Sequence, residues 1–322
     1  MGAGRVGIAA LRPDPVVRST DAVTKPVYDE FGLFHENAEE FGIELRDPPK
    51  VERVRADTGT GGSVSALRWG TAEPEIVLLH GGAQNAHTWD TVALALDRSL
   101  VAIDLPGHGH SSHRDDHAYW PAENAIAIEA GVRALAPNAK LVVGMSLGGL
   151  TALALTDRAP DVVRSLVLVD VTPGVNKEKA SAIAQFIDGP EYFESFDEIL
   201  ERTVAFNPTR TESSLRRGIL HNAIETPDGR WRWRYDLPRR GSGEGEEGRI
   251  MPGIDELWDA VAGVKVPFLL ARGSLSPVVD DDDVAELQRR NPAAEVVVVE
   301  DAGHSIQGDK PLELAQILET RL

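Results

Sequence analysis

The residues best suited to chemistry lie in one short segment, KLVVGMSLGG, at residues 140–149. Its G-x-S-x-G motif runs from Gly144 to Gly148, between an apolar run and a helical pattern. A sharp strand-to-helix turn would hold Ser146 in a strained backbone conformation, and small residues on both sides let the chain pass closely. The turn would present the serine hydroxyl at the edge of a sheet, where the N-terminus of the next helix supports developing negative charge. The motif in this setting predicts Ser146 as a nucleophile, whereas the bare motif alone would also fit an ordinary glycine turn.

A second glycine-rich turn, His80-Gly81-Gly82-Ala83, directly follows the apolar run EIVLL at residues 75–79. The backbone N–H group of Gly82 can join that of Leu147 to form an oxyanion hole for a tetrahedral intermediate. Losing one such donor typically lowers the rate about 10²- to 10³-fold. Taken alone the turn fits a plain glycine loop, so its predicted role depends on Ser146.

The composition limits the chemistry further. The 322 residues contain no cysteine, which excludes disulfides, thiolate metal sites and a cysteine nucleophile. Acidic residues outnumber basic ones by 51 to 33, and the formal charge of −18 repels phosphate backbones, so we expect no nucleic-acid partner. No apolar run approaches the roughly 18 residues of a membrane span, so we expect no membrane partner. The missing cysteines favour a cytoplasmic protein. The sequence predicts no particular oligomeric state.

Six short apolar runs predict the strands that would position these residues. They are continuously apolar, as expected of parallel strands buried on both faces, and helical patterns such as residues 121–135 and 150–158 alternate with them. This alternation predicts a doubly wound α/β fold. Two earlier runs, at residues 51–56 and 63–69, flank the turn TGTGG and predict an antiparallel hairpin. The six runs are residues 75–79, 100–103, 140–143, 165–169, 267–270 and 295–299.

One long interval interrupts the alternation. About 95 residues with helical spacing and no convincing strand separate the fourth run from the fifth, far beyond the usual connection of about 2 to 6 residues. We expect a helical cap at residues 171–264, a core formed by residues 51–170 and 265–322, and an N-terminal extension at residues 1–50. The interval also holds many of the aromatic residues: Phe186, Tyr192, Phe193, Phe196, Phe206, Trp231, Trp233 and Tyr235.

Taken in order, the segments HGGAQNAHTWD, AIDLPGHGHSS, VVGMSLGG, LVLVDVTP and DAGHSIQGDKP resemble the α/β-hydrolase superfamily over residues 51–322. The resemblance implies an eight-stranded, mostly parallel sheet with antiparallel first strands, helices on both faces and a helical cap inserted after the sixth strand. It also implies a catalytic triad in the chain order serine, acid, histidine, and Ser146 and His304 match its motifs. His304 follows the last predicted strand, where it would take the proton from Ser146 and return it to the leaving group.

The acid departs from the commonest pattern of the superfamily. Many members place an aspartate three residues after the glycine that ends the seventh strand, here Gly273, but that position is Ser276. Asp170 ends the sixth strand, which lies beside the strand that leads to Ser146. A branch of small acyl-ester hydrolases resembles this chain both in the serine at the usual acid position and in the aspartate at the end of the sixth strand. The run from Asp280 to Asp283 is the alternative, although it precedes a helical pattern and fits a helix N-cap. We favour Asp170.

The combined motifs predict a cofactor-independent serine hydrolase that cleaves a carboxylic ester of a small or medium, largely apolar molecule. In this mechanism Ser146 attacks, Gly82 and Leu147 bind the oxyanion, and His304 with Asp170 transfers the protons. A thioesterase, a lactonase or a carbon–carbon bond hydrolase would use the same triad, and a small-molecule receptor without turnover could share the fold. Epoxide hydrolases and haloalkane dehalogenases need an aspartate where this chain has Ser146.

We expect neither a metal nor a nucleotide cofactor. The histidine-rich stretch at residues 108–117 differs in spacing from the H-x-H-x-D-H motif of binuclear metallohydrolases and lies in a turn typical of the superfamily, so it is interpreted as loop structure. Asp104 in the same turn is interpreted as a structural hydrogen-bonding residue. The G-x-G-x-x-G spacing at residues 2–7 and 243–248 does not follow a predicted strand, as a dinucleotide-binding motif would, and no G-x-x-x-x-G-K-[ST] motif occurs.

Overall fold

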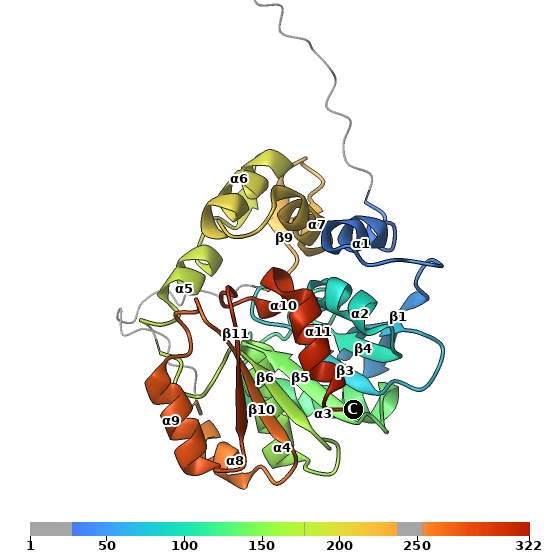
Figure 1. Cartoon of the computed structure of the whole chain (residues 1–322). Helices are drawn as coiled ribbons and strands as arrows, with labels where there is room; N and C mark the ends of the chain where they lie inside the picture. The colour runs from blue at the N-terminus through green and yellow to red at the C-terminus, as the bar shows by residue number, and fades with distance from the viewer. Residues whose placement is uncertain (1–27, 177, 237–252, 255) are drawn as a thin grey trace, which may run out of the picture.

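An eight-stranded sheet forms the centre of the computed structural model, which describes residues 28–176, 178–236, 253–254 and 256–322 (Figure 1). The strand order is β1-β2-β4-β3-β5-β6-β10-β11. The pairs β1–β2 and β2–β4 are antiparallel and the other neighbours are parallel, which confirms the predicted fold class. The strands are β1 Val51–Asp57, β2 Ser63–Trp69, β3 Ile76–Leu79, β4 Leu100–Ile103, β5 Leu141–Met145, β6 Leu166–Val169, β10 Phe268–Gly273 and β11 Glu295–Val299.

Helices cover both faces of this sheet, and each face has its own apolar core. In β3, Val77 and Leu79 point into one core while Ile76 and Leu78 point into the other, so the whole strand is buried and apolar. One face carries α3 Pro121–Leu135, α4 Leu147–Arg158, α8 Leu257–Gly263 and α9 Asp281–Arg290. The other carries α2 Asp90–Leu96, which follows the short 3₁₀ helix η1 Ala86–Trp89, together with α10 Ile306–Asp309 and α11 Pro311–Glu319.

The strand order brings the loops that follow β3, β5 and β6 together at the carboxyl ends of the strands. From β3 the chain passes to β4 on one side and then to β5 on the other side, so the connections diverge at β3. In open α/β sheets, ligands bind outside the carboxyl ends of the strands at such a point. Here β3 is followed by His80, β5 by Ser146 and β6 by Asp170.

The segment between β6 and β10 contains helices and also a small antiparallel sheet, in the order β7-β9-β8. We expected no strand here, and that expectation is wrong because strands of two or three residues leave no recognisable pattern. Helix α8 lies within the range expected for the cap but packs on α4 and α9 in the core. The other elements are α5 Ser181–Ile187, β7 Tyr192–Phe193, α6 Phe196–Phe206, α7 Glu212–Asn222, β8 Ala223–Glu225 and β9 Trp231–Trp233.

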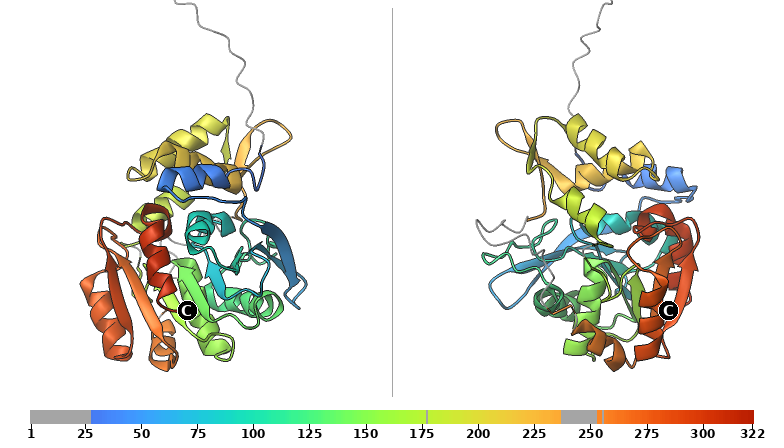
Figure 2. Two further views of the ribbon diagram at one scale, coloured as in Figure 1. Left: turned by 45° about the vertical axis from the view of Figure 1, so that its right-hand side comes forward. Right: turned by 90° about the vertical axis from the view of Figure 1, so that its left-hand side faces the viewer.

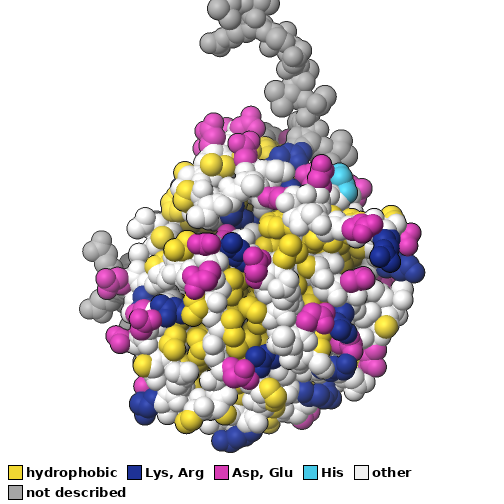
Figure 3. Space-filling view, viewed as in Figure 1, with side chains coloured by type: hydrophobic (Ala, Val, Ile, Leu, Met, Phe, Trp, Pro, Cys, Tyr) yellow, Lys and Arg dark blue, Asp and Glu magenta, His cyan; other side chains and the backbone are white. Residues whose placement is uncertain are grey.

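Helices α6 and α7 lie beyond the carboxyl edge of the sheet, with α1 Phe34–Phe41 beside α7 (Figure 2). Phe34 packs on Trp69 with the ring centroids 4.8 Å apart, and Glu40 pairs with Arg217 of α7. The described part of the N-terminal extension therefore contacts both the core and α7. On the face shown in Figure 3, acidic and basic side chains are interspersed. Within the described ranges, no helix is long and apolar enough to cross a membrane.

Candidate active site

Ser146 lies on a tight turn between β5 and α4. Its backbone has φ 51° and ψ −120°, a strained conformation for a residue with a side chain. The glycines around it are required by space: a Cβ atom on Gly144 would lie 2.3 Å from the Gly148 carbonyl oxygen, and one on Gly148 would lie 2.4 Å from the His80 oxygen. Gly149 is equally crowded, since its Cβ would lie 2.5 Å from Val171 Cγ1, and the motif did not indicate this third glycine. The Ser146 hydroxyl makes no hydrogen bond to another described residue.

The loop after β3 approaches this turn. A Cβ atom on Gly81 would lie 3.3 Å from Ser146 Cβ, and one on Gly82 would lie 3.9 Å from Leu147 Cδ2. The structure thus brings Gly82 and Leu147 together beside Ser146. Neither the N–H group of Gly82 nor that of Leu147 donates to another described residue, so both remain available to a ligand.

Two buried histidines hold the loop. His80 Nε2 accepts a hydrogen bond from Leu105 N at 2.9 Å, and burial, aided by the charge of His108, lowers the pKa of His80 to about 3. Its neutral ring therefore accepts at Nε2, while Nδ1–H donates to the Gly81 oxygen at 2.7 Å. His108 Nε2 accepts from Ala83 N at 3.1 Å, and burial also lowers the pKa of His108. These contacts make the predicted turn a rigid loop.

Asp170 and His304 form a direct pair. Asp170 is fully buried with φ 51°, and its Oδ2 atom accepts a hydrogen bond from His304 Nδ1 at 2.8 Å. The Oδ1 atom accepts from Gly273 N at 2.9 Å. The His304 loop is held in turn by Asp309, whose carboxylate accepts from Gly303 N at 2.9 Å. The arrangement fixes the imidazole with Nδ1 on the carboxylate and Nε2 directed elsewhere.

Ser276 gives Asp170 a further contact that the sequence did not indicate. Its hydroxyl donates to Asp170 Oδ2, the same oxygen that binds His304, and it accepts from Val278 N at 3.1 Å. The residue at the position of the usual aspartate thus supports the aspartate at the end of β6. Serine in a turn is too common for its type alone to reveal this contact.

The acidic run at Asp280–Asp283 has a different place in the structure. Asp280 caps α9 by accepting from Asp283 N at 2.9 Å, and Asp283 accepts from Asp280 N at 3.1 Å. Lys179 Nζ lies 2.8 Å from Asp280 and 2.7 Å from Asp283. Asp281 is 96% exposed and pairs with Arg272. None of these described carboxylates has a hydrogen bond or ion pair with His304.

The turn at residues 104–117 carries structural contacts. Asp104 is fully buried and accepts from Ala86 N at 2.8 Å, from His110 N at 3.0 Å and from Arg53 at 2.8 Å. Among the described residues, the histidines of this turn are not gathered with carboxylates as metal ligands would be. The group that is gathered consists of His87, Asp90 and His221, of which His221 is distant in sequence from the other two, and they were not singled out from the sequence.

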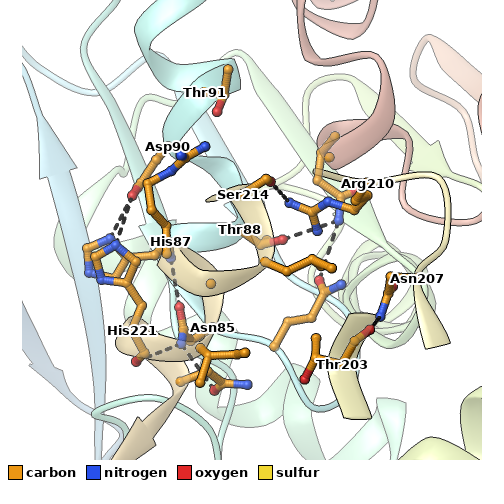
Figure 4. Close-up of a pocket in the computed structure, with 18 of the residues that line it drawn as sticks. Asn85, His87, Thr88, Asp90, Thr91, Thr203, Asn207, Arg210, Ser214 and His221 are labelled. Carbon is orange, nitrogen blue, oxygen red and sulfur yellow. Dashed lines mark hydrogen bonds and ion pairs between the residues drawn. The ribbon is translucent and has the colours of Figure 1, made fainter. Parts of the chain in front are cut away.

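A cavity of about 170 Å³ lies between α7 and the region of η1 and α2 (Figure 4). Polar side chains dominate the part shown, including Thr88, Ser214 and Arg210. Ser146 and His304 are not among its lining residues, but Gln84 is, and its Oε1 atom would lie 3.3 Å from a Cβ atom on Gly81. The cavity therefore adjoins the loop of Gly82 rather than Ser146 itself.

The aromatic residues between β6 and β10 mostly contact one another. Phe193, Trp233 and Tyr235 are buried in a separate apolar cluster, against which Phe186, Phe196 and Trp231 pack. Of the nine aromatic residues in this interval, Phe186 and Trp233 line the cavity. Aromatic composition alone did not show that most of these rings face their own cluster.

Comparisons with known proteins agree with this architecture. Residues 76–317 match the model of the alpha/beta hydrolase family. The chain is 45% identical to the esterase Rv0045c of Mycobacterium tuberculosis, over 90% of this chain and 94% of that protein. It is 30% identical to the mouse sn-1-specific diacylglycerol lipase ABHD11, over 74% of this chain and 77% of the lipase. A solved structure of Rv0045c, from work on its inhibition by transition metals, has a TM-score of 0.80 at 44% identity and covers 91% of this chain and 98% of its own. The chain therefore belongs to the alpha/beta hydrolase family and is a hydrolase.

Proposed function

We propose that this hydrolase is a serine esterase that works through an acyl-enzyme on Ser146. The observation that carries the proposal is the hydrogen bond of 2.8 Å from His304 Nδ1 to the buried carboxylate of Asp170, at the edge of the sheet where Ser146 lies on its strained turn. A carboxylate that holds Nδ1–H leaves Nε2 as the basic nitrogen. Esterase Rv0045c, 45% identical to this chain, supports ester hydrolysis as the reaction.

The proposed reaction proceeds in two stages. His304 Nε2 takes the proton of the Ser146 hydroxyl as its oxygen bonds to the ester carbonyl carbon, and the carbonyl oxygen becomes an oxyanion. His304 then protonates the departing alkoxide as the carbon–oxygen bond of the ester breaks. In the second stage His304 removes a proton from water, which attacks the acyl-enzyme, and Ser146 leaves with that proton. No hydrogen bond joins the described side chains of Ser146 and His304 in this structure. Such catalytic hydrogen bonds often form only when substrate is bound.

The N–H groups of Gly82 and Leu147 would stabilise the oxyanion in both stages. Support comes from their proximity beside Ser146 and from the absence of another described acceptor for either group. Leu147 is also the first residue of α4, so the positive end of the helix dipole faces the developing charge. The neighbouring His80 is kept neutral by burial and would not protonate the oxyanion.

Asp170 is the acid in this proposal. It accepts hydrogen bonds from Gly273, Ser276 and His304, which together fix the position of its carboxylate. The alternative carboxylates at Asp280–Asp283 are already engaged in capping α9 and in ion pairs with Lys179 and Arg272. Their bonds give the run a structural role.

We further propose a small or medium carboxylic ester as substrate, covered by a cap within residues 171–264. In this proposal the core consists of residues 51–170 and 265–322 with α8 added, because α8 packs on α4. The position of α6 and α7 beyond the carboxyl edge of the sheet supports a covering role (Figure 1). Phe186 and Trp233 supply apolar surface to the nearby cavity.

A panel of p-nitrophenyl esters and acyl thioesters of graded chain length tests the proposal with wild type, Ser146→Ala and Ser181→Ala. Ser181 is an exposed serine at the start of α5 and serves as the matched control. We expect sustained turnover of short and medium esters by wild type and Ser181→Ala, and none above background by Ser146→Ala. Preference for thioesters would change the substrate class, and binding without turnover by wild type would contradict the enzymatic proposal.

A further inference from the structure

His87, Asp90 and His221 come from three elements that meet between the core and the segment before β10. His87 lies in η1, Asp90 begins α2 and His221 lies near the end of α7, and all three are buried. Asp90 Oδ2 lies 2.8 Å from His87 Nδ1 and 3.9 Å from His221 Nε2. One ligand atom from each residue can be chosen so that all lie within 4.8 Å of one another. Figure 4 shows both imidazoles facing Asp90.

The second ring nitrogen of each histidine has its own partner. His87 Nε2 lies 3.3 Å from the Glu30 carboxylate, and His221 Nδ1 lies 3.1 Å from the Tyr28 hydroxyl. Histidines that bind metals almost always place their other nitrogen on a carboxylate, a carbonyl or another polar group, which fixes the ring orientation. The arrangement therefore leaves His87 Nδ1 and His221 Nε2 both directed at Asp90.

Asp90 is only partly satisfied by these contacts. Its Oδ1 atom is buried and has no hydrogen-bond partner among the described residues. A buried carboxylate oxygen without a partner is costly, and such a group calls for a physical explanation. The two imidazoles also stack, with their centroids 3.7 Å apart and an angle of 10° between their planes, so the rings would tilt apart to direct both nitrogens at one ion. A cation between these atoms would satisfy the carboxylate and both rings at once.

We propose that His87, Asp90 and His221 bind one divalent transition-metal ion. Two imidazole nitrogens and one carboxylate oxygen suit Zn²⁺, Co²⁺, Ni²⁺ or Cu²⁺, whereas Mg²⁺ and Ca²⁺ prefer sites made of oxygen ligands alone. All three residues line the cavity of about 170 Å³, which can supply water for a fourth coordination position. The bound ion ties α7 to the core through ligands from both.

This site is separate from Ser146 and His304 and does not depend on the esterase proposal. It is connected to the loop of Gly82 through α7: Asn85 Nδ2 donates to the His221 carbonyl at 3.1 Å, and Asn222 Nδ2 donates to the Ala83 carbonyl at 2.7 Å. Because the proposed metal site does not depend on the esterase proposal, its test measures metal binding directly and does not use turnover.

The test is a titration of metal-free full-length protein with Co²⁺, followed by visible absorption, with Zn²⁺ and Mg²⁺ as competitors. We expect one Co²⁺ per chain with a ligand-field spectrum of low coordination number, displaced by Zn²⁺ and unaffected by Mg²⁺. His221→Gln should abolish the spectrum, and the exposed His113→Gln should leave it unchanged.

Tyr28→Phe keeps the test decisive if His221→Gln does not fold. It removes only the hydroxyl on His221 Nδ1, and loss of such a contact typically weakens metal binding about 10- to 100-fold. Tyr192→Phe, at an exposed tyrosine, is its matched control and should bind Co²⁺ as wild type does. The proposal is overturned if wild type binds no Co²⁺, or if Tyr28→Phe and every folded His221 variant bind it with wild-type affinity.

Discussion

Replacement of Asp170 by asparagine is the sharpest test of the proposed triad, because the three hydrogen bonds to its carboxylate determine what the amide can do. Oδ1 accepts from Gly273 N, and Oδ2 accepts from His304 Nδ1 and the Ser276 hydroxyl. An asparagine has one acceptor oxygen and one NH₂ donor at these positions. If the NH₂ faced Gly273 N–H, two buried donors would oppose each other, at a cost of about 1–3 kcal/mol.

The amide therefore keeps its oxygen on Gly273 and turns its NH₂ toward His304. The Ser276 hydroxyl can rotate to accept, but His304 Nδ1 can accept only when the ring carries its proton on Nε2. In that tautomer the ring cannot take the proton of Ser146. The corresponding change in a serine protease triad lowers kcat about 10⁴-fold, or about 5.4 kcal/mol in the activation barrier. We expect a loss of that order in Asp170→Asn.

Steady-state hydrolysis of p-nitrophenyl butyrate, with urea unfolding as the measure of stability, provides the assay. Asp281→Asn is the matched control at an exposed aspartate and should retain wild-type kcat. Asp283→Asn should lower the free energy of unfolding by about 1 kcal/mol through the weakened cap of α9, with kcat unchanged. The reasoning is refuted if folded Asp170→Asn keeps more than a tenth of the wild-type kcat, or if Asp283→Asn loses as much as Asp170→Asn is expected to lose.

Three further predictions follow from single contacts. Gly144→Ala would place a Cβ atom against the Gly148 carbonyl, so it should lower the free energy of unfolding by about 1–3 kcal/mol and abolish turnover. Gly218→Ala, in an open helical position, should instead raise the free energy of unfolding by about 0.5–1 kcal/mol. Equal stabilities of the two variants in urea unfolding would contradict this. Ser276→Ala should lower kcat about tenfold or more with little change in KM, since it removes one donor to Asp170; an unchanged kcat would show the contact to be dispensable. The pKa of His80 is lowered from 6.5 to about 3, so the unfolded chain binds a proton at a higher pH than the folded chain does. The free energy of unfolding should therefore fall by up to about 1.4 kcal/mol per pH unit as the pH falls from about 6.5 toward 3. Titration of the His80 ring near pH 6.5, followed by NMR, would contradict this.

The central strands could be predicted because burial on both faces leaves a continuous apolar run. Every residue of β3, β4, β5 and β6 is buried, and each of these strands overlaps a predicted run. The serine turn was also recognisable, since close packing around Gly144 and Gly148 restricts those positions to glycine. Strong local constraints of this kind are visible in a single sequence.

Contacts made only by tertiary packing could not be predicted in the same way. Ser276 reaches Asp170 because β10 lies next to β6, and nothing in its own segment indicates that neighbour. His221 meets His87 because α7 packs against η1, although the two residues are far apart in the chain. Strands β7 to β9 are too short to produce an alternating pattern.

The most direct test of the proposed mechanism is the site of acylation. Wild-type protein is mixed rapidly with p-nitrophenyl butyrate, quenched in acid and digested, and the peptides are sequenced by mass spectrometry. We predict one butyryl group, located on Ser146, that appears within the first turnover, disappears as substrate is exhausted and is absent from Ser146→Ala. Sustained hydrolysis with no acyl group on Ser146, or with the acyl group on another residue, would contradict the mechanism.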